Sequence, residues 1–241
     1  MTPDPAAVVL HLRGGPYVTV GRERREVPEG SKRLLAYVSL SRAPMRRRQV
    51  AAILWPGAGE VRASGNLRSA LWRLRTAGVG LLAADKWSLR LRDDVLVDVH
   101  LMSDWAARLT RGVPHSADLA VLPSLSDALE LLPGWYDDWA LAERERMRRR
   151  LLEALEALSR ALARAGRLGE AVEAAVAAAT ADPLRESAQR ALIQAHAAEG
   201  NWVEARRSFD AYRDLLRREL GAEPSPDLAA RLPRARRLAS V

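Results

Sequence analysis

The second half of the chain repeats itself at a fixed spacing, and this repeat constrains the fold more than any other feature of the sequence. Residues Ala163, Gly166, Glu170 and Ala171 recur 34 positions later as Ala197, Gly200, Glu204 and Ala205, and Leu158 recurs as Leu192. One helix pair cannot bury its own apolar face, whereas stacked pairs can, with small residues at close approaches and glycine at the turns. The second half is therefore predicted to consist of stacked helix pairs.

A period of 34 residues is that of tetratricopeptide repeats, and it predicts a tetratricopeptide-like α-helical repeat domain over residues 99–241. Asp182 and Pro183 are predicted to start one of its helices as the cap and the first-turn residue. Asp137 and Asp138 could form a catalytic carboxylate pair. Because acidic side chains are stabilised at helix N-termini, they are predicted instead to mark the start of a helix.

Excess positive charge is confined to the first two-fifths of the chain. Residues 1–98 hold 17 Lys+Arg and 9 Asp+Glu, whereas residues 99–241 hold 21 of each. A basic module joined to a neutral one is typical of a polyanion binder fused to a part that binds other partners. The alternative is a basic surface that serves only solubility. Cysteine is absent, which excludes disulfides and thiolate metal sites and fits a reducing cytoplasm.

The order of elements predicted in the first half is that of a winged helix. Strands are predicted at residues 8–12, 17–20 and 24–27, helices at about 31–40, 46–55 and 62–77, and a hairpin at 81–91. In such folds the last helix enters the major groove, and the hairpin lies beside the DNA backbone or in the minor groove. The predicted fold is mainly α with a small α+β part: a winged helix-turn-helix DNA-binding domain over residues 1–98, followed by the helical repeat domain.

The third predicted helix carries most of the candidate DNA contacts. Its apolar stripe, which is predicted to face the core, consists of Ala63, Leu67, Ala70, Leu71 and Leu74. The DNA-binding candidates lie away from that stripe or in the hairpin turn: Arg62, Asn66, Arg68, Ser69, Trp72, Arg73, Arg75 and Lys86. Arginine can bind guanine and asparagine can bind adenine, while cations at a groove's rim hold phosphates. A basic face alone is usually only a solvated face, so the prediction rests also on element order and charge asymmetry.

Two stretches of the first half carry a family resemblance: residues 47–56, RRQVAAILWP, and residues 66–75, NLRSALWRLR. With Val97-Asp98-Val99 at the exit from the hairpin, they make residues 30–98 resemble the winged helix of the SARP (Streptomyces antibiotic regulatory protein) family, itself similar to the OmpR type. The family's hairpin usually has a glycine-rich turn and the sequence Gly-Tyr-Arg-Leu. This chain has Asp85-Lys86-Trp87-Ser88-Leu89 there.

The second half resembles the bacterial transcriptional activator domain that follows the winged helix in SARP proteins. The matching stretches are residues 132–139, 143–144, 182–186 and 219–226. Together the two resemblances imply a transcriptional activator that binds double-stranded promoter DNA as a pair of subunits on direct repeats. They also imply contact with RNA polymerase, with the loop Gly57–Val61 near the polymerase, and they imply no catalysis.

Two other functions stay open. The helical domain could sense a ligand or a partner protein, because repeat domains offer binding grooves. The chain could also be an adaptor that has lost DNA binding, since Gly65 and Trp72 are unusual on a recognition helix and the hairpin is altered. Trp135, Tyr136 and Trp139 could line a ligand pocket, but they are predicted to plug a junction between the helical domain and its neighbours.

An enzyme is the least expected class. His11, His100, His115 and His196 show no metal-ligand spacing, and the sequence has no phosphate-binding loop and no nucleophile elbow. No catalytic residue, metal or cofactor is therefore expected. No apolar run reaches eighteen residues and no signal peptide is evident, so a cytoplasmic protein with no membrane association is predicted. The four arginines of residues 231–237 could contact phosphates or form a solvated end.

Overall fold

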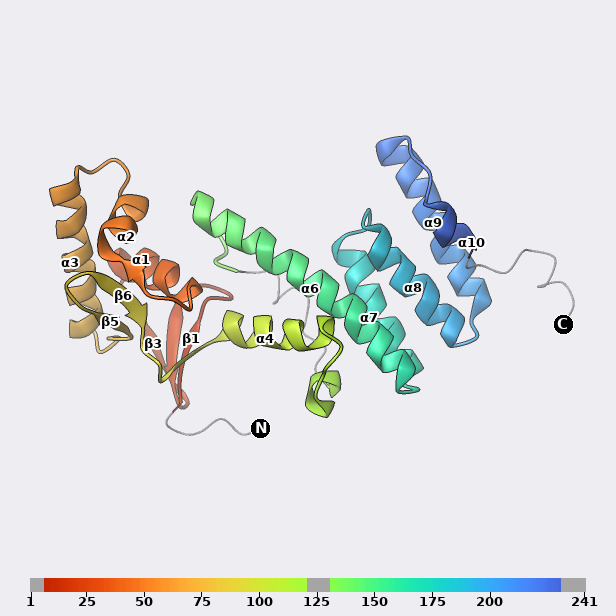
Figure 1. The fold of residues 1–241 in the computed structure, drawn as a ribbon, viewed down its shortest axis with the longest axis horizontal. Helices are drawn as coiled ribbons and strands as arrows, with labels where there is room; N and C mark the ends of the chain where they lie inside the picture. The colour runs from red at the N-terminus through yellow and green to blue at the C-terminus, as the bar shows by residue number, and fades with distance from the viewer. Residues whose placement is uncertain (1–6, 121–130, 231–241) are drawn as a thin grey trace, which may run out of the picture. The chain divides into compact units, whose positions relative to one another are not determined.

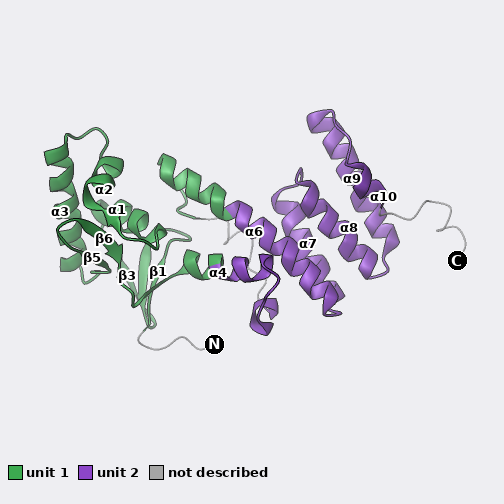
Figure 2. Ribbon diagram, in the orientation of Figure 1, with its two compact units in different colours: residues 1–103, 126–147 green, residues 104–125, 148–241 purple. Residues whose placement is uncertain are grey.

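The structure, a computed structural model, describes residues 7–120 and 131–230. These residues form two compact units (Figures 1 and 2). The described part of unit 1 comprises residues 7–103 and 131–147, and that of unit 2 comprises residues 104–120 and 148–230. Two helices, α4 (Asp98–Thr110) and α6 (Asp138–Arg164), contribute residues to both units. A mainly helical chain with a small sheet part near its start confirms the predicted fold class.

Unit 1 opens with an antiparallel meander that is closed by a parallel strand. The strands β1 (Val8–His11), β2 (Tyr17–Val20), β3 (Glu23–Glu26) and β7 (Val95–Val97) form a sheet in the order β3-β2-β1-β7. The first three strands confirm the sequence prediction, but β7, which pairs in parallel with β1, was not foreseen. The carboxylate of Asp98, directly after β7, accepts the backbone N–H groups of Leu12 and Arg13 at 3.0 Å each. These two hydrogen bonds join the end of β1 to the start of α4.

Three helices cover the core of unit 1: α1 (Glu29–Leu40), α2 (Arg47–Leu54) and α3 (Glu60–Thr76). The start of α1 was predicted at Ser31, but the helix begins two residues earlier, at Glu29. Ser31 is fully buried, and its hydroxyl donates to the carbonyl of Ala70 in α3 at 2.9 Å. This serine therefore links α1 to α3 instead of capping a helix. The predicted loop Gly57–Val61 is shorter than expected, because α3 already begins at Glu60.

A second, smaller sheet forms the wing. The predicted hairpin is present as β5 (Leu82–Ala84) and β6 (Ser88–Leu91), and a strand missed by the sequence prediction, β4 (Met45–Arg46), pairs with β6. In that pairing Met45 lies opposite Leu89, and Arg46 lies opposite Ser88. Because α2 follows β4 without a gap, the wing is hydrogen-bonded to the segment that starts α2.

Residues 131–147 complete unit 1 although they follow the winged helix in the sequence. Leu132 is buried, its N–H donates to the carbonyl of Leu12 at 3.0 Å, and its own carbonyl accepts a guanidinium N–H of Arg144 at 2.6 Å. These contacts hold Leu132 at φ 48°, a left-handed conformation that a leucine adopts only when its surroundings impose it. The functional boundary at residue 98 stays a prediction, since residues beyond it pack within the same unit.

An aromatic cluster adds to this closure. The ring of Trp139 meets Tyr37 of α1 edge-on at 5.1 Å and Trp135 at 5.9 Å, and Asp137 pairs with Arg33 of α1. The prediction that Trp135 and Trp139 fill a junction agrees with these contacts. It was wrong for Tyr136, which is 81% exposed, because this residue lies in the turn before α6. The predicted helix start at Asp137 and Asp138 agrees with α6, which begins at Asp138.

Unit 2 is a stack of helices that follows the predicted repeat. It contains the second part of α6, then α7 (Leu168–Ala181), α8 (Glu186–Ala198), α9 (Trp202–Leu220) and α10 (Pro226–Ala230), with a 3-10 turn at Ser116–Ala120. The turns between α6 and α7 and between α8 and α9 contain Gly166 and Gly200, both at positive φ. The equivalent alanines, Ala171 and Ala205, are both fully buried. Glycine at the turns and small residues in the interior are what a stacked helix pair requires.

One predicted helix start in unit 2 was wrong. Asp182 and Pro183 do not begin α8, which starts at Glu186; Asp182 instead follows the last residue of α7. The carbonyl of Asp182 accepts the N–H of Arg185 at 3.1 Å, so a turn separates the two helices. The arginine-containing tail at residues 231–237 lies outside the described residues.

Replacing Ala205 by leucine is expected to destabilise the protein by roughly 1–3 kcal/mol, because a fully buried alanine leaves no room for three more carbons. Denaturant unfolding of the full chain measures the change. Arg207→Ala is the matched control on the same helix. Its guanidinium is largely exposed and, among the described residues, pairs only with Glu204, so its loss should change stability by less than about 0.5 kcal/mol. Equal stability of the two variants would contradict the repeat packing.

Trp139→Ala should lower the stability of unit 1 by about 2–3 kcal/mol, since it removes two aromatic contacts and leaves a void beside Tyr37. The exposed neighbour Tyr136 supplies the control, and Tyr136→Ala should unfold at the wild-type denaturant concentration. If both variants unfold like the wild type, residues 131–147 do not contribute to the stability of unit 1.

Candidate nucleic-acid interface

The orientation of α3 is set by its apolar stripe. Its buried residues are Ala63, Leu67, Ala70, Leu71 and Leu74, which are the five that the sequence predicted. Helical spacing at positions three and four apart places them on one face, which packs against α1 and α2. Every other face of α3 is consequently turned away from the core of unit 1.

The candidate DNA contacts on α3 are mostly exposed. Arg62, Arg68, Ser69, Trp72, Arg73 and Arg75 are exposed, and Asn66 is half-buried. Trp72 keeps 65% of its surface exposed, so it does not cover a neighbouring apolar surface of the described chain. Among the described residues, Arg62, Arg68 and Arg75 have no hydrogen-bonded or ion-paired partner. An unpaired cation on an exposed face is available to an external anion.

The two flanks of α3 have different neighbours. On one flank, Arg73 donates to the carbonyl of Gly30 at the start of α1, at 3.0 Å. At 100° per residue, Asn66 lies on this same flank. On the opposite flank, Arg68 and Ser64 face the wing and the start of α2. The predicted residues are therefore not equivalent, because Arg73 already has a partner within the chain whereas Arg68 does not.

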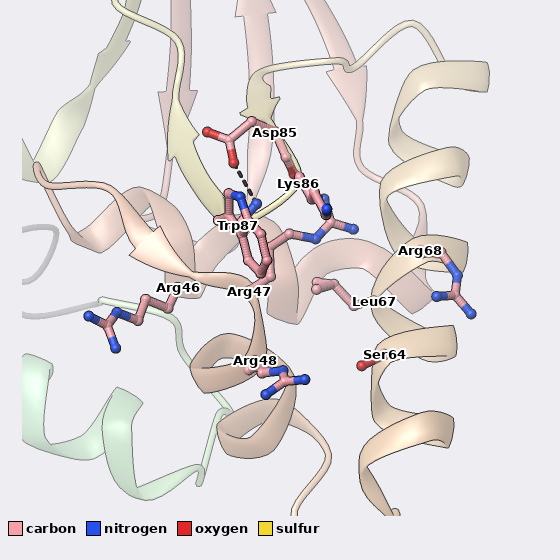
Figure 3. A pocket seen from close by; sticks show the side chains of 9 residues that line it. All are labelled: Arg46, Arg47, Arg48, Ser64, Leu67, Arg68, Asp85, Lys86 and Trp87. Atoms are coloured by element: carbon pink, nitrogen blue, oxygen red, sulfur yellow. Dashed lines mark hydrogen bonds between the residues drawn. The ribbon is translucent and has the colours of Figure 1, made fainter.

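A cavity of about 800 Å³ lies between α3, the wing turn and the start of α2 (Figure 3). We call it the wing pocket. Its lining residues are Arg46, Arg47, Arg48, Ser64, Leu67, Arg68, Asp85, Lys86 and Trp87. The pocket brings together two of the predicted DNA contacts, Arg68 and Lys86, which are 18 residues apart in the sequence. The remaining candidates, on the other faces of α3 and at its C-terminal end, do not line it.

Seven of the nine residues that line the wing pocket were absent from the predicted contacts, among them three arginines and a tryptophan: Arg46, Arg47, Arg48 and Trp87. A signal for the arginines was present in the sequence. Cations in the first turn of a helix oppose the helix dipole and lower helix stability, so three successive arginines at a predicted helix start suggest a role outside folding. Trp87 offered no such signal, because only the fold shows that its ring is exposed and not part of a core.

The wing turn is held by one carboxylate. Asp85 accepts the backbone N–H groups of Trp87 and Ser88 at 2.6 and 2.7 Å, and the hydroxyl of Ser88 at 2.6 Å. The hydroxyl of Ser88 and then the two amides lower the pKa of Asp85 below its usual value, so it is charged at neutral pH. Arg47 fixes the turn from the other side: its N–H donates to the carbonyl of Trp87 at 2.9 Å, and its guanidinium donates to the carbonyl of Asp85 at 3.1 Å.

The wing pocket carries a positive charge that the chain does not neutralise. Its five cations face one carboxylate, Asp85, which is engaged in the turn. Of these cations, only Arg48 forms an ion pair with a carboxylate among the described residues, with Glu60 at 3.1 Å. Both partners of that pair are largely exposed, so water screens the pair and it stabilises the protein little. The pocket therefore offers a concentrated positive potential to an anion.

Comparison with known proteins defines the family. The family model of the bacterial transcriptional activator domain matches residues 106–234, more than half of the chain. The chain therefore belongs to the family of proteins that carry this domain. The expectation of such a domain in the second half of the chain is confirmed.

A solved structure shows a similar fold over nearly the whole chain. It is Mycobacterium tuberculosis EmbR in complex with a low-affinity phosphopeptide, which aligns with a TM-score of 0.65 and 22% sequence identity. The alignment covers 92% of this chain and 63% of the EmbR chain, so this chain spans less than two thirds of that protein. No curated protein matches the sequence.

No helix of the described residues combines the length and the apolar character that crossing a bilayer demands. The predicted cytoplasmic location stays a prediction.

Asp85→Ala should loosen the wing turn, because it removes the acceptor of three hydrogen bonds. Hydrogen–deuterium exchange should then be faster at the amides of Trp87 and Ser88, while the amides of α1 and α2 keep their protection. Asp93→Ala serves as the control: Asp93 is an exposed acid of the same hairpin region, and within the described part of the chain it pairs only with Arg90. Unchanged exchange at Trp87 in the Asp85 variant would show that the carboxylate does not hold the turn.

Proposed function

We propose that the protein is a sequence-specific transcriptional activator that binds double-stranded promoter DNA through unit 1. In this proposal α3 enters the major groove and the wing lies beside it. One observation carries the proposal: the exposed face of α3 and the adjacent wing pocket hold cations that are unpaired within the described chain. They lie in the part of the sequence that holds the whole surplus of positive charge.

The contacts of α3 suggest a division of roles. Arg62 and Arg68 are exposed and unpaired, so they are free to make bidentate bonds to guanine or to hold phosphates. Arg73 is bonded to the carbonyl of Gly30, which favours a role in orienting α3 or in holding a phosphate at the groove's rim. Trp72 offers an exposed apolar surface for a thymine methyl group or a sugar. Ser69, Asn66 and Arg75 would supply further backbone or base contacts.

Family membership supports the second half of the proposal. A bacterial transcriptional activator domain over residues 106–234 favours recruitment of RNA polymerase, and self-association of subunits on repeated DNA sites would follow the expectation for SARP-type regulators. We propose that residues 1–98 supply the DNA contacts and residues 99–241 the partner contacts. No catalytic role is proposed for any residue, and no cofactor is required.

A second candidate is a regulator whose helical domain also senses a partner. The similar protein EmbR was solved with a phosphopeptide, which favours a peptide as the class of partner. Because this chain spans 63% of the EmbR chain, the corresponding surface need not lie within it. A phosphopeptide that changed the affinity for DNA would support this candidate, and an unchanged affinity would favour the simpler activator.

The probe is a DNA duplex from the promoter region of this protein's own gene or of a gene that it regulates. Arg68→Ala and Arg62→Ala are each expected to weaken binding to it by roughly tenfold, because each removes an unpaired cation from the DNA face. A residue that reads a base should in addition lose roughly 1–3 kcal/mol of discrimination at one position of the site. Binding series over single-base variants of the site separate the two effects.

Leu67→Ala gives the contrasting case. Leu67 is buried, so this variant should unfold more easily and should not change base preference in the folded fraction. The proposal fails if alanine at 62, 66, 68, 69, 72 and 73 in turn leaves both affinity and base preference intact in folded protein. Survival of DNA binding in that whole series would assign the function to another surface.

A further inference from the structure

The wing pocket contains an exposed aromatic ring in addition to its cations. Cations alone are enough to attract an anion, so the ring points to an additional apolar contact. Trp87 is 71% exposed, although tryptophan has a large apolar surface that folding normally buries. Figure 3 shows its ring over the middle of the pocket, between the wing turn and Leu67 of α3. A ligand that matches this site has an anionic part and an apolar part, side by side.

The backbone of Trp87 is held in place by the wing turn itself. Its N–H donates to the carboxylate of Asp85 at 2.6 Å, and its carbonyl accepts the N–H of Arg47 at 2.9 Å. The ammonium group of Lys86 lies 4.8 Å from the centre of the ring, an arrangement that leaves the rest of the ring uncovered. Main-chain bonds on both sides of the residue therefore hold its backbone beside the pocket, so contact with the ring costs only side-chain ordering and not loop ordering.

The arginines that line the pocket come from three elements. Arg46 belongs to β4, Arg47 and Arg48 belong to α2, and Arg68 belongs to α3. Neither Arg46 nor Arg68 has an ion-pair partner among the described residues. With Lys86 from the wing turn, they form a basic rim around an apolar floor and wall made by Leu67 and Trp87.

We propose that the wing pocket receives one sugar–phosphate unit of the DNA backbone, with the phosphate on the cations and the deoxyribose against the ring of Trp87. This inference rests on the proposed function: if α3 lies in the major groove and the wing beside it, the strand that separates the two grooves passes between α3 and the wing. The negative charge of a phosphate complements the positive charge of the rim. The carbon face of the sugar offers an apolar surface that can pack on the ring of Trp87. Trp87 is then an apolar contact to the backbone, and it binds without neutralising charge.

The two kinds of contact have different salt dependences. Neutralising one phosphate releases counterions and contributes about 0.9 to the salt slope of log affinity. Because the cations share this phosphate, Arg46→Ala, Arg68→Ala and Lys86→Ala should each flatten the slope, by about 0.9 in total when the three are combined. Trp87→Ala should weaken binding of a duplex from the promoter region by roughly five- to tenfold and leave that slope unchanged. Trp87→Phe should retain most of the affinity, since phenylalanine keeps an aromatic face at the same position.

Arg22→Ala is the matched control for charge. Arg22 is an exposed arginine in the turn before β3 of the same unit, and it does not line the wing pocket. Its loss should leave both affinity and salt slope unchanged. Far-ultraviolet circular dichroism of each variant, in the full-length chain, verifies that the fold is retained.

A scan with single ribonucleotides in the duplex tests the sugar contact. A 2′-hydroxyl at the seated position would be placed against the ring, so one position should weaken wild-type binding, and Trp87→Ala should abolish that effect. Free nucleoside monophosphates share the same chemistry and form a second arm. If they compete with the duplex at micromolar concentration, the pocket binds a free nucleotide and not the DNA backbone, and the proposal is overturned.

The outcomes separate this inference from the proposed function. If the wild-type protein binds no DNA duplex, neither one from the promoter region nor any other from the organism's genome, the proposed function itself is wrong. If the wild type binds, while Trp87→Ala binds equally well or lowers the salt slope as a cation does, the sugar contact is wrong and the activator proposal stands. The absence of any sensitive position in the ribonucleotide scan of a binding-competent wild type would also overturn it.

Discussion

The burial of one face of α3 is the constraint on which the rest of unit 1 depends. Five apolar side chains of this helix are removed from water against α1 and α2, and burying each large one contributes about 1.5–3 kcal/mol. The helix cannot rotate without exposing them, so its outer residues are fixed as strictly as its inner ones. Arg62, Arg68 and Trp72 are exposed because Leu67, Leu71 and Leu74 are not. A surface that contacts a partner in a defined register needs such a fixed helix.

Around α3, single polar bonds determine how neighbouring elements are placed. The hydroxyl of Ser31 in α1 donates to the carbonyl of Ala70 in α3. The carboxylate of Asp98 accepts backbone N–H groups at the end of β1. Asp85 holds the wing turn, and β4 attaches the wing to the start of α2. Each of these groups would be costly to leave unpaired if it were buried. The bonds of Ser31 and Asp98 and the pairing of β4 with β6 join segments that are distant in sequence, whereas Asp85 acts within its own turn. The pairing of β4 with β6 and the bonds of Arg47 to the wing turn join the wing to α2, and the packing of α2 on α3 completes the wing pocket.

The closure of unit 1 by residues 131–147 bears on the organisation of the whole chain. The strained backbone of Leu132, the guanidinium of Arg144 and the ring of Trp139 all serve contacts within this unit. The helix α6 that begins there continues into unit 2 as the first helix of the repeat stack. The family match, which begins at residue 106, therefore includes residues that contribute to the compactness of the winged-helix unit. A domain boundary drawn from sequence families and one drawn from packing need not coincide.

The sequence by itself determined the features that follow from local spacing. Apolar residues three and four apart defined the buried stripe of α3, glycines marked the turns at Gly166 and Gly200, and the 34-residue period defined the repeat. The fold class and the strands β1, β2 and β3 were predictable for the same reason. A helix start at Ser31 and another at Asp182 were mispredicted, because the same side chains also suit a buried tie and a turn.

Only the tertiary structure decided which residues share a site. On a helical wheel Arg73 and Arg68 occupy equivalent positions on the two flanks of the exposed face. In the structure Arg73 donates to the carbonyl of Gly30, whereas Arg68 lines the wing pocket. Arg46, Arg47 and Arg48 join Lys86 and Trp87 through strand pairing across about forty residues, which no local periodicity records. The parallel pairing of β7 with β1 and the packing of residues 131–147 are long-range in the same way. Local propensity fixes the elements, whereas burial and hydrogen bonding between distant segments fix the site that they form.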